Sequence, residues 1–155
     1  MQISIRPATQ DDAPALAHIF IAARRTMTYL PALHTDDETR RFIAHVTATS
    51  EVYVAELALG TKSIPAGFAA ISLDGEKNFL DHLYMRPDAQ DYGAGSALLA
   101  HVKTQRPQGF RLWCFAANHG AQRFYARHGL TLAKTTNGRD NEEKLPDMLY
   151  VWEPD

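Results

Sequence analysis

Cysteine is nearly absent from this sequence, which has Cys114 as its one thiol among 155 residues. A single cysteine excludes an internal disulfide and fits a reducing compartment, so we expect a cytoplasmic protein. Apolar runs of membrane-spanning length and a signal-peptide pattern at the start are also missing, so we expect no membrane partner. The net charge of −2 predicts no general affinity for nucleic acid or for an anionic membrane surface.

Repeats, low-complexity tracts and linkers are missing as well, and 155 residues are enough for one hydrophobic core. We therefore expect a single domain over residues 1–155. Alternating apolar residues predict strands, and apolar residues at helical spacing predict helices. The expected strands cover residues 3–6, 52–56, 64–73, 79–85, 110–115, 131–134 and 148–152. The expected helices cover residues 13–28, 36–48, 97–102 and 118–129.

One stretch carries the strongest functional signal. The apolar strand over residues 79–85 leads through the polar turn Gln90–Gly95 into a helix. The first backbone N–H groups of a helix have no partner within the helix, and the helix dipole favours negative charge there. Gly93 and Gly95 lack a Cβ, which lets a phosphate approach the main chain. The turn therefore predicts an anion site that suits a phosphate-bearing ligand.

Two common phosphate motifs do not fit this turn. No lysine follows Gly95, which excludes a P-loop, and Leu98 stands where a dinucleotide fingerprint has its third glycine. The Gly-x-Ser-x-Gly elbow of many hydrolases is missing too. The turn instead resembles Gln/Arg-x-x-Gly-x-Gly/Ala, the acetyl-CoA loop of the GNAT superfamily of N-acetyltransferases, with Gln90, Gly93 and Gly95 at its defining positions. The alternative is that the turn only begins a helix and that its glycines have no role in ligand binding.

A second segment resembles the same family. After the strand at residues 110–115, Asn118 is followed by a helix that carries Phe124 and Tyr125 and ends at Gly129. The family has a strand, an Asn, a helix with Phe-Tyr and then Gly-Phe/Leu, in this order. In the family the Asn contacts the pantetheine arm, and the Tyr lies beside the thioester sulfur. A core tyrosine with a bonded hydroxyl is the alternative for Tyr125, and the two segments in family order favour the functional interpretation.

The resemblance implies both a fold and a ligand. The fold is an α/β (α+β sandwich) arrangement, with a mixed, mostly antiparallel sheet of about seven strands flanked by four helices, in the GNAT-like acyl-CoA N-acyltransferase fold. The ligand is acetyl-CoA as co-substrate, with no metal, held in a gap between the splayed parallel strands 79–85 and 110–115. The acceptor is a small-molecule or peptide amine, and a homodimer is allowed because dimers are common in the family. The cofactor-binding residues implied in this way are Leu83, Tyr84, Met85, Gln90, Asp91, Tyr92, Gly93, Ala94, Gly95, Ser96, Asn118 and Arg123.

Two loop residues depart from the usual family pattern. Asp91 stands where Gly is frequent, and Tyr92 stands where Lys or Arg is frequent. A carboxylate near a pyrophosphate repels it, unless Asp91 instead caps the helix. Arg86, Lys103 and Arg123 are the candidates to supply positive charge from nearby, with Arg123 directed toward the 3′-phosphate.

Direct acyl transfer to an amine needs a base, a stabilised oxyanion and a proton for the departing thiolate. Tyr125 is the candidate acid, since phenol and thiol pKa values lie within about two units of each other. A main-chain N–H of Met85 or a neighbour is expected to stabilise the oxyanion. Asp81 and His82 are the candidate bases on the central strand, and His34 in the loop after the first helix is a third. Asp81 shares side-chain parity with Met85, whereas His82 points to the opposite face, where a structural histidine is its alternative role.

The acceptor site is expected between the first two helices and their joining loop, as in the family. The polar segment 135–147 either lines this pocket or is a solvated loop. We expect an N-acetyltransferase that moves an acetyl group from acetyl-CoA to a primary amine by direct attack on the thioester. The alternative is a non-catalytic acyl-CoA-binding module, which would keep the phosphate loop and lose the acid and the acceptor pocket.

Overall fold

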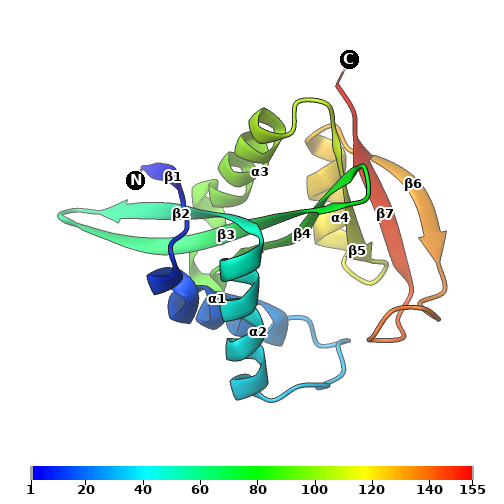
Figure 1. Cartoon of the computed structure of the whole chain (residues 1–155), viewed down its shortest axis with the longest axis horizontal. Coiled ribbons are helices and arrows are strands. Elements are labelled where there is room, and N and C mark those ends of the chain that lie inside the picture. Colours follow the sequence, from blue (N-terminus) through cyan, green and yellow to red (C-terminus); the bar gives the residue numbers. More distant parts are fainter. Residues whose placement is uncertain (1, 155) are drawn as a thin grey trace.

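The computed structural model describes residues 2–154 and, within them, all side chains except that of Asp91. Figure 1 shows helices packed against one twisted sheet. In chain order the elements are β1 (Ile3–Pro7), η1 (Gln10–Asp12), α1 (Ala13–Arg25), α2 (Asp36–Thr49), β2 (Glu51–Leu59), β3 (Lys62–Asp74), β4 (Lys77–Met85), η2 (Pro87–Tyr92), α3 (Ala94–Gln105), β5 (Phe110–Phe115), α4 (His119–Arg127), β6 (Thr131–Thr136) and β7 (Asp147–Trp152).

The seven strands of the described chain form one sheet in the order β1-β2-β3-β4-β5-β7-β6. Neighbouring strands are antiparallel except for the central pair β4 and β5, which runs parallel. This confirms the expected mixed, mostly antiparallel sheet with four α-helices. The parallel pair is possible because α3 lies in the crossover connection, which returns the chain to the end of the sheet where β4 began.

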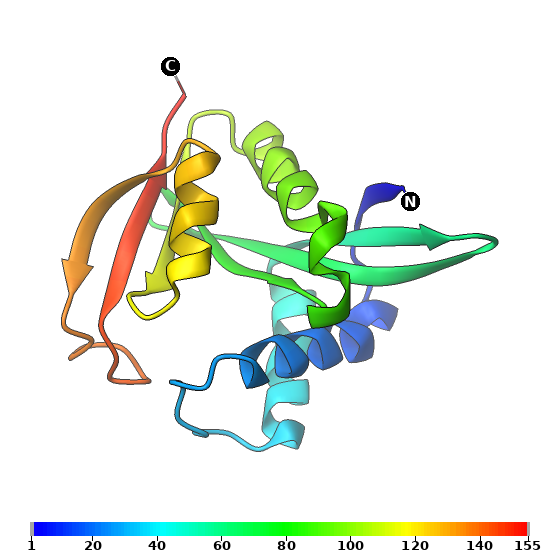
Figure 2. The ribbon, with the colours of Figure 1, turned by 180° about the vertical axis from the view of Figure 1, so that it is seen from behind.

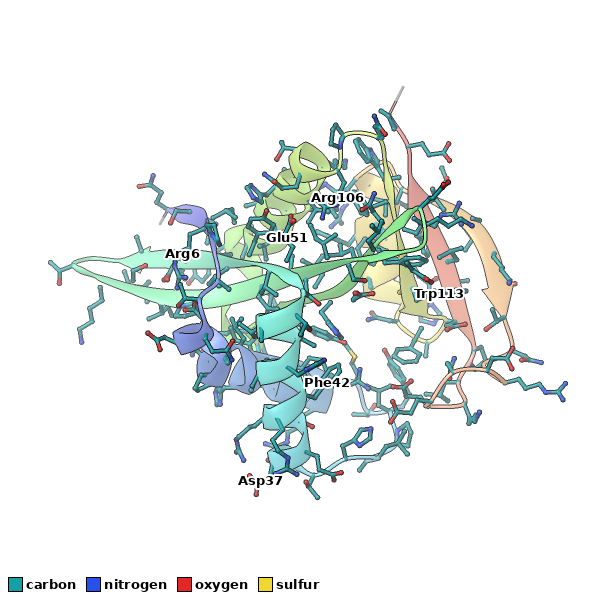
Figure 3. All side chains as sticks on the ribbon, viewed as in Figure 1. Arg6, Asp37, Phe42, Glu51, Arg106 and Trp113 are labelled. Carbon is teal, nitrogen blue, oxygen red and sulfur yellow. The ribbon has the colours of Figure 1, made fainter. Side chains whose placement is uncertain are left out.

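The four helices are divided between the two faces of the sheet. α1 and α2 cover one face, and α3 and α4 cover the other (Figures 1 and 2). Alternation along β2 shows why both faces are apolar: Val52 and Val54 pack toward α1 and α2, whereas Tyr53 and Leu57 pack toward α3. The far end of α3 is tied to this strand by the ion pair of Arg106 with Glu51, at 3.1 Å (Figure 3).

The two N-terminal helices begin and end for identifiable reasons. α2 starts at the expected capping box, in which the Glu38 N–H donates to Thr35 Oγ1 at 3.1 Å and the Thr35 N–H donates to Glu38 Oε1 at 2.9 Å. α1 is shorter than expected, ending at Arg25 instead of Thr28. The Thr26 hydroxyl donates to the Ala23 carbonyl at 2.6 Å, and the chain then turns toward Pro31, whose ring disfavours helix in the residue before it.

The central parallel pair does not stay paired. β4 and β5 form one ladder pair among the described residues, Phe79 with Arg111, and the strands then diverge (Figure 2). The sheet is therefore open beyond this pair, toward the carboxyl ends of both strands. This gap lies between the helical layers, and the loop after β4 and the start of α4 lie beside it.

Candidate active site

The N-terminus of α3 has backbone donors without helical acceptors. The first intrahelical bond is donated by the Ala97 N–H to the Gly93 carbonyl at 3.0 Å, so the N–H groups of Ala94, Gly95 and Ser96 precede the bonded turns. Gly93 has a φ of +80°, a left-handed conformation that favours glycine. A Cβ at this position would meet no atom within 4 Å, so open space lies in front of the helix.

Gly95 has a different role from the one its spacing suggests. It is buried inside the first turn of α3, and a Cβ there would lie 3.1 Å from Met85 Cε and 3.4 Å from Phe124 Cζ. Its missing side chain therefore lets α3 pack closely on β4 and α4 and does not open a path for a phosphate. The open space at Gly93 agrees with the expectation that a phosphate can approach there. The close neighbours of Gly95 do not agree with that expectation, which is corrected for this residue.

The other predicted loop residues are arranged around the same turn. Gln90 and Tyr92 are exposed, and Ala94 is fully buried beneath the turn. Ser96 is exposed, with its Oγ 3.1 Å from the His128 Nε2. The side chain of Asp91 lies outside the described part of the chain.

The ladder between β3 and β4 determines which backbone groups face the gap. At its end the Arg86 N–H donates to the Ala66 carbonyl at 2.8 Å. Bonded and non-bonded pairs alternate in an antiparallel ladder, so Tyr84 bonds to β3 whereas Leu83 and Met85 direct their N–H and C=O groups toward β5. Leu83 and Met85 therefore offer free main-chain groups at the gap. Tyr84 does not, because its backbone bonds to β3.

α4 brings its predicted residues to the other side of the gap. Asn118 is the N-cap, and its Oδ1 accepts a hydrogen bond from the Ala121 N–H at 3.1 Å, which leaves its side-chain NH2 group available. Tyr125 is buried in the core cluster shared by the sheet, α3 and α4. Burial, and then the nearby Cys114, raises the pKa of Tyr125, so its phenol stays protonated at neutral pH. Arg123 is exposed on the same helix.

A groove of about 950 Å³ lies on the α1 and α2 side of the sheet. It is lined by α1, the loop that joins α1 to α2, α2, one residue of β4 and two of the β6–β7 loop. The β4 residue is His82, and the loop residues are Glu142 and Glu143. The segment 135–147 thus lines the groove at these two positions. Figure 3 shows Phe42 of α2, which is another lining residue.

His82 is one of the two candidate bases that line this groove. Its ring lies in an aromatic cluster, with ring centroids 5.7 Å from Phe20, 5.6 Å from Phe42 and 6.2 Å from Tyr84. Burial, opposed by Asp81 and assisted by Arg24, lowers the His82 pKa below its ordinary 6.5. The ring is therefore neutral near pH 7, as a base must be.

The other two candidate bases lie in different surroundings. Asp81 is exposed and falls in a β-bulge, where the pairing of Ala70 with His82 is followed by that of Ile71 with Leu80. The bulge breaks the simple side-chain alternation that the sequence suggested, and Asp81 does not line the groove. His34 does line it, where its Nε2 contacts a carboxylate oxygen of Glu142.

Two residues of α1 and the loop after it, Arg24 and Tyr29, were not singled out from the sequence. Arg24 lines the groove one helical turn after Phe20, and its position beside the apolar stripe of α1 was the one available signal. Tyr29, in the loop after α1, has a buried hydroxyl without a hydrogen-bond partner among the described residues. Neither contact can be read from local sequence, because both depend on how the loop folds over the sheet.

The chain belongs to the GNAT acetyltransferase family, because residues 48–130, more than half of the chain, match the family model described as an acetyltransferase (GNAT) domain. The protein is thus an acyltransferase. Members of the family typically use acyl-CoA. No curated protein matches the chain in sequence.

Solved structures resemble the whole chain. The apo form of YjaB from Escherichia coli is 22% identical with a TM-score of 0.75, and both chains are covered completely. A GNAT-family acetyltransferase from Bacillus cereus is 16% identical with a TM-score of 0.76, covering 100% of this chain and 99% of that one. PaiA N-acetyltransferase from Thermoplasma acidophilum, in complex with coenzyme A, is 15% identical with a TM-score of 0.70 and 99% coverage of both chains. These likenesses show the same fold.

Two further findings concern residues 2–154. No helix there is long and apolar enough to cross a membrane. No group of three or more His, Cys, Asp and Glu residues there is arranged to hold a metal ion.

Proposed function

We propose that the protein is an acetyl-CoA-dependent N-acetyltransferase that moves an acetyl group to a primary amine by direct transfer. The observation that carries this proposal is the gap between β4 and β5, which pair only at Phe79 and Arg111 among the described residues. The unpartnered N–H groups of α3 lie on one side of this opening, and the groove with His82 lies on the other face. Two substrates can therefore meet through the sheet.

The residues present fit acetyl-CoA. The N–H groups of Ala94, Gly95 and Ser96 suit the pyrophosphate, and the open space at Gly93 gives it room. Leu83 and Met85 suit the pantetheine amides, which then extend the sheet as a strand would. Asn118 offers its side-chain NH2 group to the same arm, and exposed Arg123 suits the 3′-phosphate.

In this proposal the chain's residues move two protons and stabilise one charge. The thioester of acetyl-CoA supplies an acetyl carbon that is activated for attack. His82 is neutral and takes a proton from the amine, directly or through water. The Met85 N–H faces the gap and stabilises the developing oxyanion. Tyr125 holds its proton and donates it to the departing thiolate.

Cys114 takes no part in this chemistry. It is buried, and burial raises the pKa of its thiol to about 11, so it is not a nucleophile at neutral pH. A single reduced thiol fits our proposal that the protein works in the cytoplasm.

The test is Tyr125→Phe, measured by thiol release from acetyl-CoA with a panel of primary amines. No hydrogen bond of the Tyr125 hydroxyl is present among the described residues, so its removal leaves no partner unsatisfied and the fold should persist. We expect turnover to fall roughly a hundredfold or more with little change in acetyl-CoA affinity. Tyr150→Phe, which removes the hydroxyl of another tyrosine of the same core cluster, is the control and should keep its rate.

Two results would count against the proposal. Unchanged turnover in Tyr125→Phe would show that this tyrosine packs in the core and is not the acid. Binding of acetyl-CoA without acetylation of any amine would indicate an acyl-CoA-binding module.

A further inference from the structure

One arginine lies on the inner wall of the groove, beside the candidate base. The Arg24 guanidinium packs over the Phe20 ring at 5.3 Å from its centroid. Its Nη1 donates to Tyr84 Oη at 3.3 Å, and its Nη2 donates to Glu143 Oε2 at 3.2 Å. Phe20 also packs edge-on against both His82 and Tyr84. Arg24 and His82 therefore belong to one side-chain cluster.

We propose that Arg24 is the binding site for a carboxylate of the acceptor, so the acceptor is a free amino acid with an apolar or aromatic side chain. This inference rests on the proposed function. The amine and the carboxylate of an amino acid are separated by one carbon atom, which suits two partners in one cluster. The amine then lies at His82, the carboxylate lies on Arg24, and the side chain packs against Phe20 and Phe42.

The present partners of Arg24 are replaceable. Its bonds of 3.2 and 3.3 Å are longer than the roughly 2.7–2.9 Å of strong charge-assisted bonds. By contrast, Arg6 holds Asp12 with two bonds of 2.8 Å. Glu143 comes from the β6–β7 loop and also borders a second cavity of about 490 Å³, so its side chain has room to move away.

Arg24 stays charged in this setting. Burial alone would lower its pKa, but Tyr84 and Glu143 outweigh that effect and raise it. A guanidinium with its planar donor edges matches a carboxylate in two-bond geometry better than a single ammonium does. The wall of the groove thus keeps a permanent positive charge next to the neutral ring of His82.

Each carboxylate that lines the described groove has a partner within the protein. Asp36 pairs with Arg25 at 2.7 Å, and Glu142 pairs with His34. Glu38 accepts the Thr35 N–H at the start of α2. Glu143 is the partner of Arg24 itself. In the described groove, Glu143 is thus the carboxylate that an acceptor's carboxylate would replace on Arg24.

The experiment compares acceptors that differ only in the carboxylate, using the full chain with saturating acetyl-CoA. The pairs are L-phenylalanine with 2-phenylethylamine, and L-leucine with 3-methylbutylamine. We expect kcat/KM to be roughly tenfold or more higher for the amino acid of each pair. Arg24→Gln should remove this preference by lowering kcat/KM for the amino acids at least tenfold more than for the simple amines.

Glu143→Gln breaks the same ion pair from its other end and separates recognition from structure. If the pair is only structural, the two variants behave alike, which would overturn the inference. If Arg24 binds the acceptor, Glu143→Gln frees it and keeps or lowers KM for the amino acid. Arg40→Gln is the control, because Arg40 pairs with Asp37 at 2.6 Å outside the groove. Equal or better kcat/KM for the simple amines in the unmodified protein would also overturn the inference.

A binding measurement keeps this inference separate from the proposed function. N-acetyl-L-phenylalanine is titrated calorimetrically into the protein saturated with CoA. Binding that is lost in Arg24→Gln and kept in Glu143→Gln supports the carboxylate site, even where no amine of the panel is acetylated and the proposed function fails. No binding to the unmodified protein would overturn the carboxylate site.

Discussion

Partly buried His82 and buried Tyr125 are held uncharged by their surroundings on opposite faces of the sheet. Burial lowers the pKa of His82, which makes its ring available as a proton acceptor at neutral pH. Burial raises the pKa of Tyr125, which keeps its phenol available as a proton donor. An acid and a base whose environments move their pKa values in opposite directions are a common arrangement for proton transfer. Their separation across the gap matches the order of the proposed reaction, because the amine and the thiolate lie at its two ends.

The pH dependence of turnover tests His82 directly. The proposed base acts when neutral, and its pKa is lowered, so kcat should fall only as the pH drops below about 6.5. His82→Gln should reduce kcat by roughly a hundredfold and remove this acidic limb. His18→Gln, which changes an exposed histidine on α1 outside the groove, should keep it. A limb that persists in His82→Gln and disappears in His34→Gln would assign the base to His34.

The proposed cofactor site depends on one element, the N-terminus of α3. Gly93 has a left-handed φ and open space at its Cβ, so Asn and Asp are the side chains best tolerated there, whereas a branched residue is strained. Gly93→Asp places a carboxylate where the pyrophosphate is proposed to bind, and Gly93→Asn is its neutral match. We expect CoA affinity to be about tenfold or more lower in the Asp variant, measured by calorimetric titration. The helix dipole stabilises the added Asp, so the unfolding temperature of the Asp variant should be no lower than that of the Asn variant. Equal affinities would contradict the loop assignment.

The joint between β1 and α1 is expected to control acid stability. Arg6 bonds Asp12 twice at 2.8 Å and the Thr9 N–H donates to Asp12 at 2.7 Å, and these contacts lower the pKa of Asp12 to about 2. A lowered pKa stabilises the fold above the unfolded value near 3.8, and this contribution disappears as the pH falls toward 2. Asp12→Asn should therefore cost about 1–2 kcal/mol at pH 7 and little at pH 2, by urea unfolding.

Exposed Asp11 provides the matched control for this joint. It makes no hydrogen bond among the described residues, so Asp11→Asn should change the free energy of unfolding by less than about 0.5 kcal/mol at either pH. An equal loss in Asp12→Asn at pH 7 and pH 2 would show that packing and not charge holds the joint.

Hydrophobic periodicity was enough to predict the elements of this fold, because each strand and helix has an apolar face that reports its period. The mixed, mostly antiparallel sheet and its parallel central pair came from the family resemblance. The bulge at Asp81 could not be predicted, since an extra residue in one strand depends on the partner strand. The buried packing role of Gly95 was equally hidden, because it depends on Met85 and Phe124 in other elements.

At the scale of the whole molecule, the sheet separates the two proposed substrates and the gap joins them. The groove takes residues from α1, α2, β4 and the β6–β7 loop, which are distant in sequence. That is why Arg24 and Glu143 could not be paired from the sequence, although each is visible there. The acceptor side is consequently the part of this fold that local patterns describe least, and the phosphate side, built from one continuous turn, is the part they describe best.

The last prediction concerns association of whole chains. β1 and β6 are the edges of the sheet, and nearly all of β6 is exposed, including Leu132 with 48% of its surface accessible. An open edge with an exposed apolar residue is a surface for strand pairing, so we propose a homodimer through β6. Light scattering at micromolar protein should give about twice the 17.3 kDa of one chain. Leu132→Lys should shift this mass to that of a monomer, because it places charge at the edge. Leu73→Lys, at the far end of β3, alters an even more exposed leucine and should leave the dimer intact. A monomeric mass for the unmodified protein would end the proposal.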